Sequence, residues 1–129
     1  MARTCCLAGI DPAKVPLFSG VFKTAGVPAL ATLARLDVTE LGKLAPDLLV
    51  CDVDAVDVDS LELLRRIRFV LPTCVIAVYT GIMEPGWCLS CHLAGANCLL
   101  SKDSDEQTLS AGVRGALITG CYTDPRFAA

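Results

Sequence analysis

Short runs of apolar residues alternate along the chain with segments in which apolar residues recur every three or four positions. An apolar run of strand length, closed by glycine, proline or a charged residue, is typical of a strand buried on both faces of a parallel sheet. These runs predict strands at Arg3–Gly9, Val27–Leu33, Leu48–Cys51, Val75–Tyr79 and Asn97–Leu100.

The segments between the runs have helical spacing. In the first of them, Phe18 and Phe22 recur on one face, and Gly26 is placed to end the helix. The other expected helices are 37–45, one that opens near Asp59 or Ser60, 84–94 and 104–117. Capping pairs stand at three of the starts, namely Asp37 with Glu40, Asp59 with Glu62 and Ser104 with Gln107. The alternation predicts a doubly wound (βα)5 α/β domain, a flavodoxin-like three-layer sandwich with a five-stranded parallel sheet.

The composition limits the classes of protein to consider. The chain has 129 residues, 53% of them hydrophobic, and a net charge of −3. It is therefore long and apolar enough for one folded domain, and too acidic for a large nucleic-acid footprint. The longest uncharged stretch, Phe69 to Met83, has 15 residues and contains a proline, whereas a membrane-spanning helix needs roughly 20 apolar residues.

Eight cysteines raise the question of disulfides. The first ten residues contain no secretory apolar core, so we expect a cytoplasmic protein with reduced thiols. Five of the cysteines lie in or beside the predicted strands, where a thiol behaves as a small buried hydrophobe: Cys5, Cys6, Cys51, Cys74 and Cys98. Cys88 and Cys91 remain as candidates for reactivity.

Four polar residues come at or just after the ends of predicted strands: Asp11, Asp52, Thr80 and Lys102. The carboxyl ends of parallel strands meet at one rim of the sheet, where ligands of doubly wound domains bind. A carboxylate nucleophile, a hydroxyl and an ammonium group suit the handling of a phosphoryl group, with Mg²⁺ to balance the charge. The alternative is that Lys102 and Asp52 simply form an ion pair in a cleft.

At this point the sequence resembles the receiver domains of bacterial two-component response regulators. The resemblance covers nearly the whole chain and rests on four motifs: Pro46-Asp47-Leu48-Leu49-Val50-Cys51-Asp52, the helix Asp59-Ser60-Leu61-Glu62-Leu63-Leu64-Arg65-Arg66-Ile67-Arg68, the strand Val75-Ile76-Ala77-Val78-Tyr79-Thr80-Gly81, and Gly95-Ala96-Asn97-Cys98-Leu99-Leu100-Ser101-Lys102-Asp103. The tail Gly120-Cys121-Tyr122-Thr123-Asp124-Pro125 is similar to the one that leads, in NarL/LuxR-type regulators, into a helix-turn-helix domain.

The resemblance implies a CheY-like signalling module that is not an enzyme. Asp52 would be the phosphoacceptor, with Thr80 and Lys102 stabilising the aspartyl phosphate and Mg²⁺ held by Asp11 and Asp52. The implied partners are a sensor histidine kinase, a second copy of the chain bound through the last helix and the Leu99 strand, and DNA through a domain absent from this chain, with no membrane. The receiver domain would span residues 1–119, and residues 120–129 would begin a linker.

Departures from the family pattern lead to a second hypothesis. After the first strand the family has two adjacent acids, whereas this register gives Gly9-Ile10-Asp11-Pro12, so at most one acid survives. Ala55-Val56 replaces Met-Pro, Ser60 replaces glycine, and Leu99 replaces the aromatic switch residue. These changes predict a pseudo-receiver, a phosphorylation-independent dimerisation and protein-interaction module. Asp54 either adds a ligand to the metal site or is a solvated loop acid.

One motif points to another class of function. Cys88-Leu89-Ser90-Cys91-His92 matches the C-x-x-C-H pattern of c-type haem attachment, so a haem or thiol redox sensor is the remote alternative. The arginines Arg65, Arg66 and Arg68 are expected on a solvated helix face.

Overall fold

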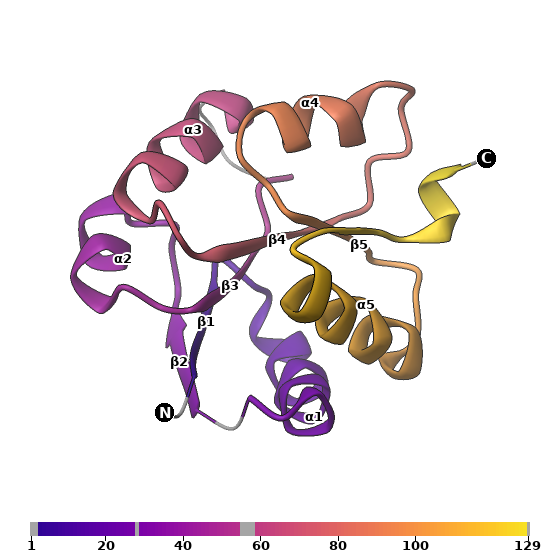
Figure 1. Ribbon diagram of the computed structural model, residues 1–129, viewed down its shortest axis with the longest axis horizontal. Helices are drawn as coiled ribbons and strands as arrows, with labels where there is room; N and C mark the ends of the chain where they lie inside the picture. Colours follow the sequence, from indigo (N-terminus) through magenta and orange to yellow (C-terminus); the bar gives the residue numbers. More distant parts are fainter. Residues whose placement is uncertain (1–2, 28, 55–58, 129) are drawn as a thin grey trace.

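Six parallel strands form one sheet in the order β2-β1-β3-β4-β5-β6 in the computed structural model, which describes residues 3–27, 29–54 and 59–128 (Figure 1). The strands are β1 (Thr4–Ala8), β2 (Ala29–Leu33), β3 (Leu48–Cys51), β4 (Val75–Thr80), β5 (Cys98–Ser101) and β6 (Tyr122–Thr123). The α-helices are α1 (Val15–Ala25), α2 (Val38–Leu44), α3 (Ser60–Val70), α4 (Trp87–Leu93) and α5 (Glu106–Thr119). Two short 3-10 helices, η1 (Pro12–Lys14) and η2 (Pro125–Ala128), follow β1 and β6.

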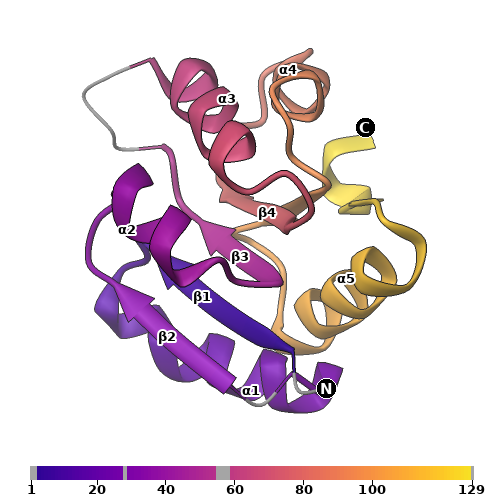
Figure 2. The same cartoon turned by 60° about the vertical axis from the view of Figure 1, so that its left-hand side comes forward.

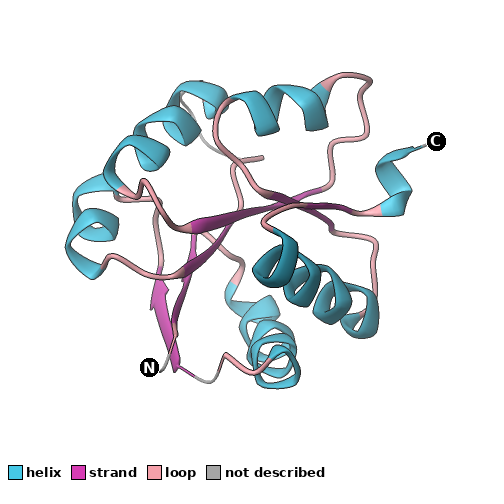
Figure 3. Cartoon of the chain, viewed as in Figure 1, coloured by secondary structure: helices cyan, strands magenta, loops and turns pink. Residues whose placement is uncertain are grey.

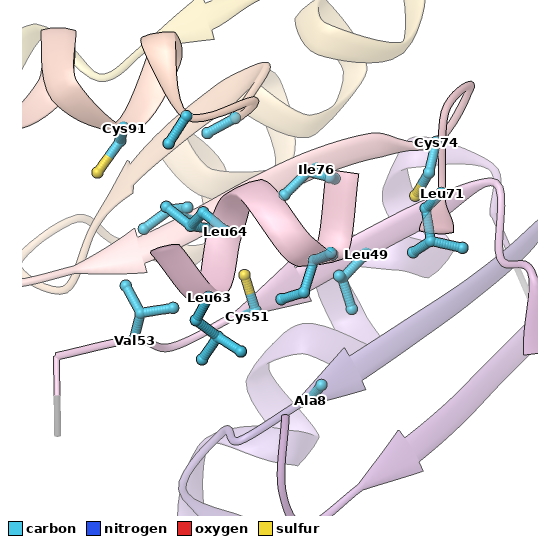
Figure 4. Close-up of a cluster of buried hydrophobic side chains, with 14 of the residues drawn as sticks. Ala8, Leu49, Cys51, Val53, Leu63, Leu64, Leu71, Cys74, Ile76 and Cys91 are labelled. Carbon is cyan, nitrogen blue, oxygen red and sulfur yellow. The ribbon is translucent and has the colours of Figure 1, made fainter. Parts of the chain in front are cut away.

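Helices cover both faces of the sheet, α1 and α5 on one and α2, α3 and α4 on the other (Figures 2 and 3). Successive residues of a strand point to opposite faces, so each strand contributes to two cores. In β3, Leu48 and Val50 pack with α1 and α5, whereas Leu49 and Cys51 pack with the helices of the other face (Figure 4). All four side chains of β3 are fully buried, which confirms the prediction of a three-layer α/β sandwich with a parallel sheet.

The prediction of five strands was wrong, because β6 adds a sixth. Tyr122 and Thr123 pair in parallel with Cys98 and Leu99, inside the segment that the sequence assigned to the start of a linker. A strand of two residues is too short to form an apolar run, so the sequence pattern did not reveal it. Asp124, which follows β6, is buried and accepts hydrogen bonds from the Ser104 hydroxyl and the Arg126 amide.

The helix starts were predicted with mixed success. Asp37 and Asp59 cap α2 and α3 as expected, by accepting hydrogen bonds from backbone amides of the first turn. The expected cap of α5 was wrong, because the Ser104 hydroxyl donates to Asp124 instead. Asp105 caps α5, and its carboxylate accepts a hydrogen bond of 2.8 Å from the Thr108 amide.

Arg68 does not lie on a solvated face, which corrects the expectation for it. Its guanidinium group donates to the carbonyl oxygens of Leu71, Cys74 and Gly95 and to Asn97 Oδ1, at 2.6 to 3.1 Å. These acceptors lie in the turns that lead into β4 and β5. One side chain therefore holds together the two loops that begin the central strands.

Two glycines of α5 should respond to alanine in opposite directions. A Cβ atom on Gly112 would lie 2.6 Å from Tyr122 Cε2 and 3.1 Å from Leu100 Cδ2, whereas one on Gly115 would come only within 3.6 Å of Tyr122 Cδ1. Overpacking typically costs about 1–3 kcal/mol, and alanine gains up to about 1 kcal/mol over glycine in a helix. We expect Gly112→Ala to lower the free energy of unfolding by about 1 kcal/mol and Gly115→Ala to raise it by about 0.5 kcal/mol. Urea denaturation measures both, and changes of the same sign would contradict the packing argument.

Candidate functional site

Three of the residues expected at the strand ends lie together at the carboxyl rim of the sheet. Asp52 follows β3, Thr80 ends β4 and Lys102 follows β5. The Lys102 Nζ atom is 2.7 Å from Asp52 Oδ2, so these two groups form an ion pair. β4 lies between β3 and β5 in the sheet, which brings Thr80 to the same rim.

Asp54 stands at the centre of this rim. Its Oδ1 atom accepts a hydrogen bond of 2.7 Å from the Thr80 hydroxyl, and its Oδ2 atom accepts one of 2.8 Å from the Gly81 amide. The same Oδ2 atom is 3.0 Å from Lys102 Nζ. The side chain is only 14% exposed, so the interpretation of Asp54 as a solvated loop acid was wrong.

Thr80 is fully buried, and its hydroxyl has three partners. It donates to Asp54 and accepts from the Ile82 amide at 3.1 Å and from Trp87 Nε1 at 3.2 Å. Trp87 is the first residue of α4, and sequence reasoning did not identify it. The only signal for it was its position, seven residues after Thr80, as the one tryptophan of the chain.

Lys102 stabilises two carboxylates at once. Burial disfavours its charged form, but the hydrogen bonds and charges of Asp52 and Asp54 together outweigh that effect and raise the pKa of Lys102. Its ammonium group also lies 6.0 Å from the centre of the Tyr79 ring. The lysine therefore remains a cation over the whole neutral pH range.

A pocket of about 180 Å³ opens beside the ion pair and is lined by Asp11, Lys14, Asp52, Tyr79 and Lys102. The Asp11 side chain is exposed, and its Oδ1 atom accepts a hydrogen bond of 3.0 Å from the Ala13 amide at the start of η1. The Tyr79 hydroxyl is buried and has no hydrogen-bond partner among the residues that the structure describes. Burial also raises the pKa of Tyr79.

The described residues do not fit the Mg²⁺ site that the resemblance implies. Within residues 3–27, 29–54 and 59–128, no group of three or more His, Cys, Asp or Glu side chains is arranged to hold a metal ion. The Lys102 ammonium already forms ion pairs with the carboxylates of both Asp52 and Asp54. Asp54, which the sequence offered as an additional metal ligand, uses its oxygens for Thr80, Gly81 and Lys102 instead. Ala55 and Val56, where the family has Met-Pro, lie outside the described residues.

The geometry argues against a haem or redox site at Cys88, Cys91 and His92. Cys91 belongs to α4 and its side chain is buried in the core (Figure 4). Burial raises the pKa of Cys91 to about 12. Burial also raises the pKa of Cys88. Both ring nitrogens of His92 are engaged, with Nδ1 at 2.8 Å from the Ala96 carbonyl oxygen and Nε2 at 2.9 Å from Thr123 Oγ1. A reactive cysteine needs a lowered pKa and access to solvent, and a histidine that binds haem iron needs a free ring nitrogen.

The remaining cysteines assigned to the core are buried, as predicted. Cys5, Cys6, Cys51, Cys74 and Cys98 are all at most 4% exposed. In the part of the chain that the structure describes, no helix is both long and apolar enough to cross a membrane.

Known structures share this fold over nearly the full chain. No protein-family model matches the sequence. A LuxR-family two-component response regulator from Aurantimonas sp. SI85-9A1 is 22% identical, with a TM-score of 0.79, over 99% of this chain and 94% of that one. The isolated REC domain of RcsB from Salmonella enterica serovar Typhimurium, in the presence of phosphomimetic BeF3−, is 18% identical, with a TM-score of 0.75. The match covers 99% of this chain and 97% of that one. The chemotaxis protein CheY4 from Vibrio cholerae is 19% identical, with a TM-score of 0.71, and the match covers 88% of this chain and 97% of that one. These likenesses show that the chain has the receiver-domain fold.

Proposed function

We propose that this chain is a receiver domain of two-component signalling, in which the state of the site around Asp52 is passed to a partner. One observation carries the proposal: the Lys102 ammonium lies 2.7 Å from the Asp52 carboxylate at the carboxyl rim of a receiver-type sheet. The Thr80 hydroxyl and the Gly81 amide lie at the same rim, where they donate to Asp54, and they are the kinds of donor that phosphoryl oxygens need.

The reaction would be phosphoryl transfer from a sensor histidine kinase. An oxygen of the Asp52 carboxylate attacks the phosphorus atom, and the P–N bond to the kinase histidine breaks. The bonding electron pair returns to the imidazole ring, which takes up a proton. Lys102 stabilises the charge on the phosphoryl oxygens, and the Thr80 hydroxyl donates a hydrogen bond to one of them.

A second candidate is a phosphorylation-independent pseudo-receiver. It is favoured by Asp54, which already binds the donors that a phosphoryl group would need. In either case the signal needs an interaction surface. Leu89 and Leu93 on α4 and Ile118 on α5 are 63%, 78% and 79% exposed, which supports binding of a second copy of the chain or another protein there. Regulation of transcription would run through an attached DNA-binding domain.

Beryllofluoride, added with and without Mg²⁺, tests the acceptor function, because it mimics a phosphoryl group on aspartate. We expect a saturable change in the NMR signals of Thr80, Gly81 and Lys102, and we expect Asp52→Asn to abolish it. Asp103→Asn removes an exposed carboxylate next to Lys102 and serves as the matched control, which should respond like the wild type. Absence of any response, both in the wild type and in an Asp54→Ala variant, would reject the acceptor function.

A further inference from the structure

The Asp54 carboxylate binds three donor groups at the carboxyl ends of β4 and β5, one of which, the Lys102 ammonium, it shares with Asp52. These groups are the hydroxyl of Thr80, the amide of Gly81 and the ammonium of Lys102, at 2.7, 2.8 and 3.0 Å from its two oxygens. They differ in chemistry, and together they form a binding site for an anion with several acceptor oxygens. A phosphoryl group on Asp52 would present oxygens to the same donors.

We propose that Asp54 is a built-in anion that takes the place of the phosphoryl group, holding the donors in their occupied arrangement and competing with phosphorylation of Asp52. The proposal rests on the acceptor function above and specifies its regulation. The chain would thus present the surface formed by the exposed leucines of α4 whether or not Asp52 is phosphorylated. A phosphoryl group would have to displace Asp54 before it could bind the three donors.

The local structure favours this intramolecular occupant. Asp54 lies two residues from Asp52, and its own amide donates a hydrogen bond of 2.9 Å to Asp52 Oδ1, which fixes the turn between them. A tethered group competes at an effective concentration in the millimolar range or above, because its encounter with the site is not diluted in solution. Its side chain is largely shielded from water, so its ion pair with Lys102 is screened less than one on the surface.

A chain of hydrogen bonds connects Asp54 to the helix that carries the exposed leucines. Thr80 donates to Asp54 and accepts from Trp87 Nε1, and Trp87 begins α4. Trp87 is an aromatic side chain that contacts Thr80 directly, through its indole nitrogen at 3.2 Å from the hydroxyl oxygen. A change at Asp54 should reach α4 through this contact and alter the fluorescence of the only tryptophan in the chain.

Removal of the Asp54 carboxylate tests the competition. We expect Asp54→Ala to bind beryllofluoride at least tenfold more tightly than the wild type under the same conditions, with or without Mg²⁺, as measured by a titration of Trp87 fluorescence. Asp54→Asn keeps the size of the side chain and removes its charge, so it should also bind more tightly. The control Asp103→Asn should match the wild type. Equal affinities of wild type and both Asp54 variants would overturn the proposal and leave the acceptor function standing. No binding by any of them would reject the acceptor function and the proposal with it.

A second measurement needs no phosphoryl mimic. The Gly81 amide donates to a charged acceptor, so its proton signal should move upfield in Asp54→Ala and remain in place in Asp103→Asn. The Trp87 emission should change in the same variant. Unchanged Gly81 and Trp87 signals in a folded Asp54→Ala protein would overturn the proposal.

Discussion

Raising the pH from about 8 to about 10 should lower the free energy of unfolding by about 7 kcal/mol, because the folded core holds thiols in their protonated form. Burial raises the pKa of Cys5 and Cys6 from 9.0 to about 11, and that of Cys74, Cys91 and Cys98 to about 12. Above the ordinary pKa the unfolded chain releases these protons while the folded chain retains them. The stabilisation is thus complete below pH 9 and is lost as the pH rises towards the folded values, at about 1.4 kcal/mol per thiol and pH unit.

Urea denaturation at a series of pH values, under reducing conditions, measures this loss. Cys98→Ala should reduce the difference between pH 8 and 10 by about 1.4 kcal/mol, since one buried thiol is removed. Cys121 is exposed, and its replacement by serine should leave the difference unchanged. A free energy of unfolding that stays constant up to pH 10 would contradict the argument.

Replacing Arg68 with alanine should lower the free energy of unfolding by about 3 kcal/mol, although Arg68 contacts no carboxylate among the residues described. The guanidinium group is half-buried, and burial lowers its pKa. Its hydrogen bonds reach three backbone carbonyls and the Asn97 side chain, and Asn97 Oδ1 in turn accepts from the Ile76 amide of β4. Alanine would leave these acceptors without their charged donor and would open a gap between α3 and the loops before β4 and β5.

Thermal denaturation should show this loss as a fall in Tm of about 10 °C. Arg65 is the matched control: it lies on the same helix, and among the described residues its one ion pair is an exposed contact with Glu62 at 3.5 Å. Arg65→Ala should change the free energy of unfolding by less than about 0.5 kcal/mol. Arg68→Lys should recover little, because an ammonium group lacks the planar fork that reaches several acceptors. If Arg68→Ala and Arg65→Ala lowered the free energy of unfolding by the same amount, the hydrogen bonds of Arg68 would not stabilise the fold more than an exposed ion pair does.

The fold could be predicted from sequence because its central strands are unbroken apolar runs. Leu48–Cys51 is the clearest, since burial on both faces of the sheet requires every residue to be apolar. The strand β6 could not be predicted, because two residues carry no periodicity and its position depends on backbone bonds to β5. The cap of α5 was missed for a related reason. Ser104 and Asp105 are both good caps in isolation, and the choice between them is made by Asp124, 20 residues away.

The site was predictable to the extent that strand ends define it. Asp52, Thr80 and Lys102 follow directly from the rule that parallel strands present their carboxyl ends at one rim. The position of Asp54 was not predictable, since it depends on how a loop after β3 turns its side chain towards β4. Arg68 was misassigned because arginine usually lies at the surface, and the sequence does not show which carbonyls lack partners at the ends of distant strands.

The short strand β6 also limits how the sheet can grow. An open strand edge offers unpaired amides and carbonyls to other chains, and long flat edges promote aggregation. On this side the edge strand has only two residues, and Pro125, which lacks an amide proton, turns the chain into η2 soon after. This edge of the sheet therefore gives another chain almost no template for strand addition.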